Sequence, residues 1–200
     1  SLGDYTAKAE IQNWQKSGIN SLNDNLRGEP KVSELADRAS AFLCEYTGAS
    51  IGAFYVTDNN EEYLTLAGGF ALGDFEKSKK TIGLKEGLTG ECAASRRHLH
   101  VKDVKDDYFY ISSSTGKSVP GEIFLFPLIY SDKLHGVIEL GKYGNFSDKE
   151  IEFLKNTSAI IGAAVNSSKS REALTELLRR TQQLAEELQV QQEELRSSNQ

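Results

Sequence analysis

Apolar residues in the first fifty positions recur at the spacing of α-helices. Ile11–Leu26 carries one such stripe, which ends at the Gly-Glu-Pro break of residues 28–30. A second stripe follows in Val32–Tyr46, and Gly48 supplies a typical helix stop. The pattern predicts two helices, the second with its apolar side buried against the rest of the chain.

Two pairs of short apolar runs follow, each pair separated by a polar turn. Ile51–Val56 pairs with Tyr63–Ala67, and Ile123–Tyr130 pairs with Leu134–Leu140. Such runs around a turn predict two β-hairpins. Pro127 has no N–H to donate, which favours an edge or bulge position for it.

These strands are almost continuously apolar, although an antiparallel sheet with one wet face alternates apolar and polar residues. Both faces of the predicted sheet must therefore be covered. We expect helices on one face and a lid on the other. The lid comes from the segment between the hairpins, with Lys80–Leu84, a short helix opening at Gly87–Gly90, and the polar stretch Lys102–Gly121.

The C-terminal part predicts a long helix. Ser147 and Glu150 form a capping-box pattern at its start. From residue 174 a heptad can be drawn in which leucine fills five of eight core positions, and polar residues fill the others. This predicts a weak coiled coil that pairs two chains and shifts at low cost, while the alternative is a single solvated helix. The predicted dimer seam comprises Trp14, Leu22, Leu174, Leu177, Leu184, Leu188 and Leu195.

Composition narrows the class of protein. A hydrophobic content of 38% supports one packed core, and a net charge of −6 argues against a nucleic-acid partner. No apolar run is long enough to span a membrane, so we expect no membrane contact within this chain. Cys44 and Cys92 form no CxxC pair, which suits the cytoplasm, and three scattered histidines argue against a metal site.

Both ends of the chain lie in helical patterns, and Ser1-Leu2 has the character of a cloning remnant. We therefore expect a piece of a longer signalling protein whose output activity lies in the flanking regions.

Three stretches resemble the GAF domain family: Glu86–Glu91, Ile123–Leu128 with His135–Leu140, and Phe146–Asp148. The resemblance implies an α+β fold, a GAF/PAS-like six-stranded antiparallel sheet with helices on one face and a ligand pocket under a lid on the other. It covers residues 30–166. Leu184–Leu195 is similar to the connectors that follow GAF domains in bacterial hybrid sensor histidine kinases, and Trp14–Gly28 resembles the helix that precedes them. The resemblance implies two-component signalling, a kinase region in the same protein, and connector helices over residues 1–29 and 167–200.

The expected pocket lies between the sheet and the lid, although each apolar wall residue also fits an ordinary core. Gly87, Thr89 and Gly90 stand at a helix start, where free amides suit an anion, and a plain turn is the alternative. The predicted wall residues are Phe54, Phe70, Ile82, Leu88, Phe109, Ile111, Ile123 and Leu125.

The resemblance leaves the cofactor unknown and argues against three kinds. Bilin-binding relatives commonly follow their attachment cysteine with histidine, whereas Ala93 follows Cys92. His98 and His100 share a strand face without a third ligand for haem or iron, so we expect exposed histidines. The cyclic-nucleotide motif of the family matches at Lys142 and Phe146, but its Asn and its adjacent Asp-Glu are missing.

Three function classes remain. The first is a non-catalytic sensory module that binds a small molecule and shifts the packing of dimeric terminal helices. The second is a spacer without a ligand that only relays rotation. The third is a redox enzyme like the GAF-fold sulfoxide reductases, but two distant cysteines do not reproduce their cysteine cluster.

Overall fold

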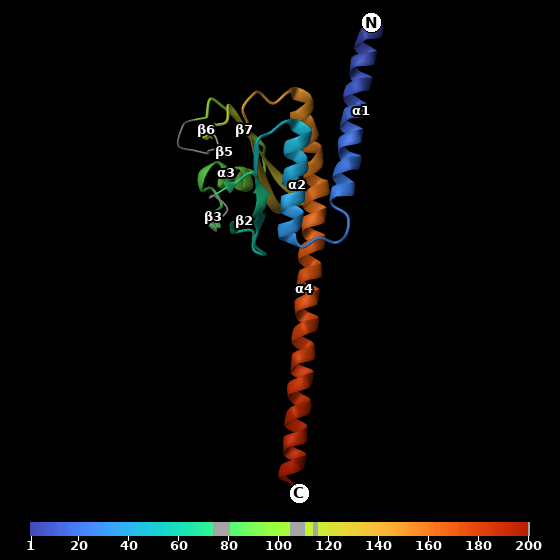
Figure 1. Ribbon diagram of the computed structural model, residues 1–200, viewed down its shortest axis with the longest axis vertical. Coiled ribbons are helices and arrows are strands. Elements are labelled where there is room, and N and C mark those ends of the chain that lie inside the picture. Colours follow the sequence, from blue (N-terminus) through green and yellow to red (C-terminus); the bar gives the residue numbers. More distant parts are fainter. Residues whose placement is uncertain (74–80, 105–110, 114–115, 200) are drawn as a thin grey trace.

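A computed structural model describes residues 1–73, 81–104, 111–113 and 116–199 of the chain (Figure 1). Eight strands and four helices are assigned within these residues. The helices are α1 (Leu2–Asn25), α2 (Val32–Thr47), α3 (Gly87–Ser95) and α4 (Asp148–Ser198). The strands are β1 (Ile51–Thr57), β2 (Tyr63–Phe70), β3 (Thr81–Gly83), β4 (Leu99–Lys102), β5 (Ile111–Ser113), β6 (Gly116–Ser118), β7 (Glu122–Tyr130) and β8 (Lys133–Lys142).

Six strands form one antiparallel sheet in the order β3-β2-β1-β8-β7-β4, while β5 and β6 form a separate two-stranded ribbon. Both predicted hairpins are confirmed, as β1–β2 and β7–β8. Pro127 lies beyond the part of β7 that pairs with β4, and a register shift follows it between Leu128 and Ile129. Its missing N–H therefore costs no ladder bond on that side.

The two faces of the sheet carry separate apolar clusters. Side chains alternate along each strand, so Phe54, Phe126 and Ile138 join the cluster under α2 and α4, which we call the helix face. Tyr55 and Leu125 join the cluster under α3, which we call the lid face. The prediction that both faces are covered is confirmed, and with it the α+β fold (Figure 1).

Helix α1 packs along the outside of α2 and α4 through an aromatic cluster (Figure 1). The Trp14 ring stacks on Tyr46 with 4.6 Å between centroids and meets Phe153 edge-on at 5.3 Å. Leu22 is fully buried in the helix-face core. Leu22 is therefore removed from the predicted seam, while Trp14, which is half-buried, stays a prediction there.

Helix α4 is anchored at both ends of its contact with the domain. At its start the predicted capping box is confirmed, because the Ser147 hydroxyl accepts from the Glu150 amide. The Lys142 ammonium there lies 2.9 Å from Glu150 and donates to the Thr47 carbonyl at 2.8 Å. At residue 168, a serine hydroxyl donates to the Pro30 carbonyl at 2.7 Å.

The 51 residues of α4 run unbroken through position 167. At 1.5 Å per residue such a helix is about 75 Å long. Figure 1 shows that its second half projects away from the sheet, at the end of the molecule opposite the N-terminus, and its side chains there are exposed. No helix among the described residues is long and apolar enough to cross a membrane.

The close approach of α1 depends on Gly18. A Cβ atom built there would lie 2.4 Å from the Tyr46 ring and 2.5 Å from that of Phe153. We predict that Gly18→Ala destabilises the chain by about 1–3 kcal/mol relative to Gly3→Ala, because overpacking outweighs the gain in helix propensity. A Cβ atom built at Gly3 would lie 3.8 Å from its nearest neighbour, so the control Gly3→Ala measures the gain in helix propensity without overpacking. Urea unfolding measures both variants, and equal stabilities would contradict the prediction.

Candidate ligand-binding site

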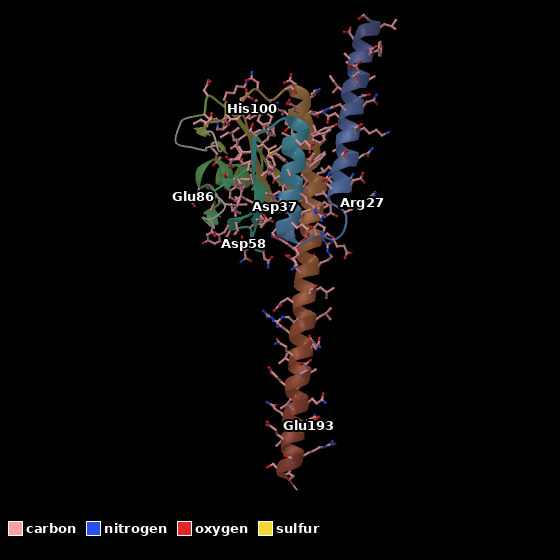
Figure 2. The ribbon with its side chains drawn as sticks, in the orientation of Figure 1. Arg27, Asp37, Asp58, Glu86, His100 and Glu193 are labelled. Atoms are coloured by element: carbon pink, nitrogen blue, oxygen red, sulfur yellow. The ribbon has the colours of Figure 1, made fainter. Side chains whose placement is uncertain are left out.

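The lid helix α3 lies close to the sheet because two glycines allow it. Gly87 adopts a φ of +64°, and a Cβ at Gly90 would lie 2.5 Å from the Gly83 carbonyl oxygen. The Glu86 carboxylate accepts from the Gly83 amide at 2.9 Å and so ties the helix start to β3. Figure 2 shows Glu86 on the side of the sheet opposite α4.

A buried carboxylate lies beneath this lid, in the middle of the sheet. Glu139 of β8 sits between Ala53 of β1 and Leu125 of β7 and is 3% exposed. The Thr89 hydroxyl in the first turn of α3 donates to its Oε2 at 3.0 Å. A buried carboxylate requires hydrogen-bond or charge partners, so Glu139 is a polar centre within an apolar layer.

The negative charge of Glu139 affects the pKa of two neighbouring side chains, Tyr55 and Cys92. Burial raises the pKa of the Tyr55 hydroxyl, and the negative charge of Glu139 raises it further. Burial and then Glu139 likewise raise the pKa of the Cys92 thiol to about 12. Cys92 therefore stays protonated at neutral pH, and its thiol donates to the Arg97 carbonyl at 3.1 Å. The cluster of Glu139, Thr89, Tyr55 and Cys92 is called the Glu139 cluster below.

This electrostatic environment changes the kind of ligand that fits. A negative charge next to Thr89 repels the anion that the α3 start suggested. A ligand with an ammonium group, or with several N–H or O–H donors, complements a buried carboxylate. The anion site at Gly87, Thr89 and Gly90 and its alternative, a plain turn, both stay predictions.

The predicted wall residues separate into several groups. Ile123 and Leu125 are buried on the lid face, and Ile82 and Leu88 pack half-buried against the same cluster. Phe54 instead belongs to the helix face, since its neighbours Ala53 and Tyr55 occupy the lid face, so its assignment is corrected. Phe70, at the end of β2, is 41% exposed. Ile111 begins β5, and Phe109 lies outside the described residues.

The pocket prediction did not include Glu139, although the sequence carried a signal for it. It is the only carboxylate in the apolar strand β8. An acidic residue within a run that reads as buried on both faces needs a partner or a function.

The two histidines have other surroundings than a metal site. His100 Nε2 lies 2.7 Å from Glu122 Oε2, which also accepts from the Phe146 amide at 2.9 Å. His100 is therefore half-buried and paired, which corrects the expectation that both are exposed, whereas His98 is exposed. Among the described residues no group of three or more His, Cys, Asp or Glu is arranged to hold a metal ion.

Lys142, Phe146 and Cys44, which bear on cofactor or redox chemistry, lie on the helix face. Lys142 is engaged by Glu150 and stands 5.6 Å from the Phe146 ring centroid. Cys44 is buried in the helix-face core, and that burial raises the pKa of its thiol to about 12. The sheet separates Cys44 from Cys92, so the two thiols do not form a redox pair.

A six-stranded antiparallel sheet with helices on one face and a lid helix over a buried polar centre defines an α+β domain. A model of the GAF domain family matches residues 30–166, and the chain belongs to that family. No curated protein matches the chain.

Several solved structures share the fold. The GAF domain from a phosphoenolpyruvate-protein phosphotransferase of Coxiella burnetii gives a TM-score of 0.64 at 15% identity, covering 82% of this chain and 96% of that one. The corresponding Acinetobacter domain gives 0.66 at 14% identity, with 80% and 97% covered. Free methionine-R-sulfoxide reductase from Neisseria meningitidis, in complex with its substrate, gives 0.60 at 18% identity, with 81% and 93% covered. At these identities the likeness shows the fold alone.

The Glu122 contacts generate a pH prediction. Burial raises the pKa of its carboxyl, but the Phe146 amide and His100 outweigh that effect and hold it below its ordinary value of 4.5. The ionised form therefore stabilises the fold above pH 4.5, and the stabilisation is lost as the pH falls through the lowered pKa. We predict that Glu122→Gln costs about 1–3 kcal/mol at neutral pH, and less in acid.

Urea unfolding across this pH range measures the difference. Glu91→Gln, on the exposed side of α3, is the matched control and should change little. A Glu122→Gln deficit that stays constant into strong acid would show that the charge is not involved.

Proposed function

We propose that this chain is the non-catalytic sensory module of a bacterial sensor histidine kinase, located in the cytoplasm. In this proposal the Glu139 cluster binds a small molecule, and α4 relays its occupancy to a kinase region of the same protein. The single observation that carries the proposal is the buried carboxylate under the lid helix. Buried ionisable groups of this kind concentrate at functional sites because they are costly to keep in a purely structural role.

The path to α4 is short in the fold. Ile138 and Leu140 flank Glu139 in β8 and point to the opposite face, where they share the helix-face core with Phe153 and Leu154 of α4. A ligand that displaces Glu139 also displaces these neighbours, because packed cores do not deform locally without cost. Since α4 leaves the domain as one continuous helix, a change in its packing reaches the projecting half.

The enzyme alternative is less well supported. Nucleophilic or redox chemistry at cysteine needs an accessible thiolate. Cys92 is fully buried and its thiol pKa is raised to about 12. The spacer without a ligand remains the competing hypothesis, and it differs in one measurable respect, namely whether anything binds at Glu139.

Native mass spectrometry of the purified chain tests the ligand half of the proposal. We expect a co-purifying small molecule with an ammonium group or several hydrogen-bond donors. Glu139→Gln should weaken its binding by about tenfold to a hundredfold, because a charged hydrogen bond contributes roughly 1.5–3 kcal/mol. Glu91→Gln should retain it. A wild-type chain that carries no small molecule would favour the spacer.

We also propose that the projecting half of α4 pairs with a second copy of the chain. The leucines at heptad spacing are all exposed, and a stripe of this kind in water favours association. Their exposed fractions are 57% for Leu174, 60% for Leu177, 60% for Leu184, 59% for Leu188 and 64% for Leu195.

Sedimentation tests the pairing. We predict that the chain is a dimer at high micromolar concentration and that Leu184→Gln with Leu188→Gln makes it monomeric, because both changes place polar groups in the seam. Val190 is 54% exposed but lies off the heptad positions, so Val190→Gln should leave the dimer intact. A wild-type monomer, or equal disruption by Val190→Gln, would contradict the proposed seam.

A further inference from the structure

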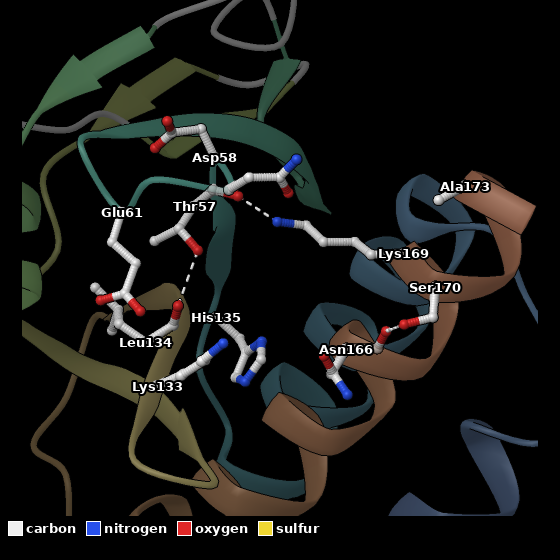
Figure 3. A pocket seen from close by; sticks show the side chains of 11 residues that line it. Thr57, Asp58, Glu61, Lys133, Leu134, His135, Asn166, Lys169, Ser170 and Ala173 are labelled. Atoms are coloured by element: carbon white, nitrogen blue, oxygen red, sulfur yellow. Dashed lines mark hydrogen bonds between the residues drawn. The ribbon is translucent and has the colours of Figure 1, made fainter.

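A cavity of about 240 Å³ lies where α4 leaves the domain, apart from the Glu139 cluster (Figure 3). Its walls are the loop after β1, the turn between β7 and β8, and the α4 segment from Asn166 to Ala173. It therefore joins the tips of both central hairpins to the root of the projecting helix.

The central group of this cavity is the ammonium of Lys169. The side chain is half-buried, and its Nζ donates to the Thr57 carbonyl (Figure 3). Burial lowers the pKa of Lys169, which is the response of a cation that has lost solvent. In the described parts of the chain no carboxylate lies within ion-pair distance of it.

The acidic side chains around the cavity are occupied elsewhere. The Asp58 carboxylate accepts from the amides of Glu62 and Tyr63, both at 2.8 Å, within its own loop. Glu61 pairs with Arg96 at 2.9 Å. The charges of Asp58 and of Glu172 on α4 offset part of the effect of burial on the Lys169 pKa, but the hydrogen bond of its ammonium goes to the neutral Thr57 carbonyl.

Two further donors face the same space. Lys133 extends from the β7–β8 turn, and Asn166 stands one helical turn before Lys169 (Figure 3). His135 is buried in the wall, and its Nε2 lies 3.2 Å from the Tyr130 carbonyl oxygen. A carbonyl only accepts, so this nitrogen carries the hydrogen and the ring is fixed in place.

We propose that this cavity is a binding site for a small oxyanion of the size of inorganic phosphate, held between Lys169 and Lys133 with Asn166 as a further donor. A charged acceptor makes stronger hydrogen bonds with an ammonium than the neutral Thr57 carbonyl does. The volume admits a small ion, and the two lysines come from elements that approach each other only in the fold.

Occupancy has a mechanical consequence for α4. Lys169 follows Ser168, whose hydroxyl bonds Pro30, and Arg171 donates to the same carbonyl at 3.2 Å. An anion bridging Lys169 to Lys133 adds a second attachment, to the β7–β8 turn, close to where α4 leaves the domain. The site therefore stiffens the root of α4 whether or not a ligand occupies the Glu139 cluster.

The test is an NMR titration of the full chain with inorganic phosphate at constant ionic strength, with chloride as the balancing anion. We expect saturable amide shifts at Thr57, Lys133 and Asn166–Ser170, and slower amide exchange over residues 166–173. Lys169→Met and Lys133→Met should each weaken binding at least about tenfold, the effect of one lost charge-assisted bond. Lys8 is exposed on α1 and is far from Lys169 in the sequence, so Lys8→Met should bind phosphate as the wild type does.

Amide shifts that do not saturate below about 10 mM phosphate would mean a Kd too weak for a built site and would overturn the proposal. Equal binding by Lys133→Met would also overturn it, and since this side chain is exposed, its replacement does not threaten folding. Neither outcome bears on the Glu139 cluster, so this inference and the proposed function fail separately.

Discussion

The structure depends on one constraint, a sheet whose two faces are both apolar. Strands β1, β7 and β8 present large hydrophobic side chains in both directions, and neither set is stable in water. The helix face is closed by α2 and α4, and the lid face by α3. Because α4 is one of the covers, the same helix that completes the core also extends out of the domain. A change in the packing of the core therefore also changes the geometry of the projecting helix.

Within this arrangement Glu139 is exceptional. A carboxylate in the middle of an apolar layer costs free energy, and the Thr89 hydroxyl compensates part of that cost. Burial, and after it the negative charge of Glu139, raises the pKa of Tyr55 and of Cys92, so the Cys92 thiol is not a reactive thiolate at neutral pH. A second polar centre, around the ammonium of Lys169, lies at the root of α4.

Much of the fold could be predicted from the sequence, because its signals are local. The stop of α2 at Gly48, both central hairpins and the Ser147–Glu150 cap follow from spacing and turn chemistry. The short strand β3 lacks such a signal, since three residues do not define a period.

The site was less predictable, for a physical reason. Successive side chains of a strand point to opposite faces of the sheet. In a strand that is apolar at every position, the sequence does not show which alternate set faces the lid, so the prediction for Phe54 is wrong. Leu22 was assigned to a dimer seam because a stripe does not reveal whether its partner is in the same chain. Glu139 and Lys169 are single polar residues whose neighbours come from distant segments of the chain. Their surroundings can therefore be recognised only once the fold is known.

In the proposed function, the lid face and α4 are coupled through β7 and β8. Amide hydrogen exchange of Glu139→Gln measures this coupling, with α2 as the internal reference because α2 packs on β1 and β2 and reaches β7 and β8 mainly through α4, whereas α4 packs on β7 and β8 directly. The account predicts that exchange in α4 between Phe153 and Ser168 accelerates more than exchange in α2, and that Glu91→Gln changes neither helix. Acceleration confined to α3 and β8, or equal acceleration in α2 and α4, would contradict the coupling.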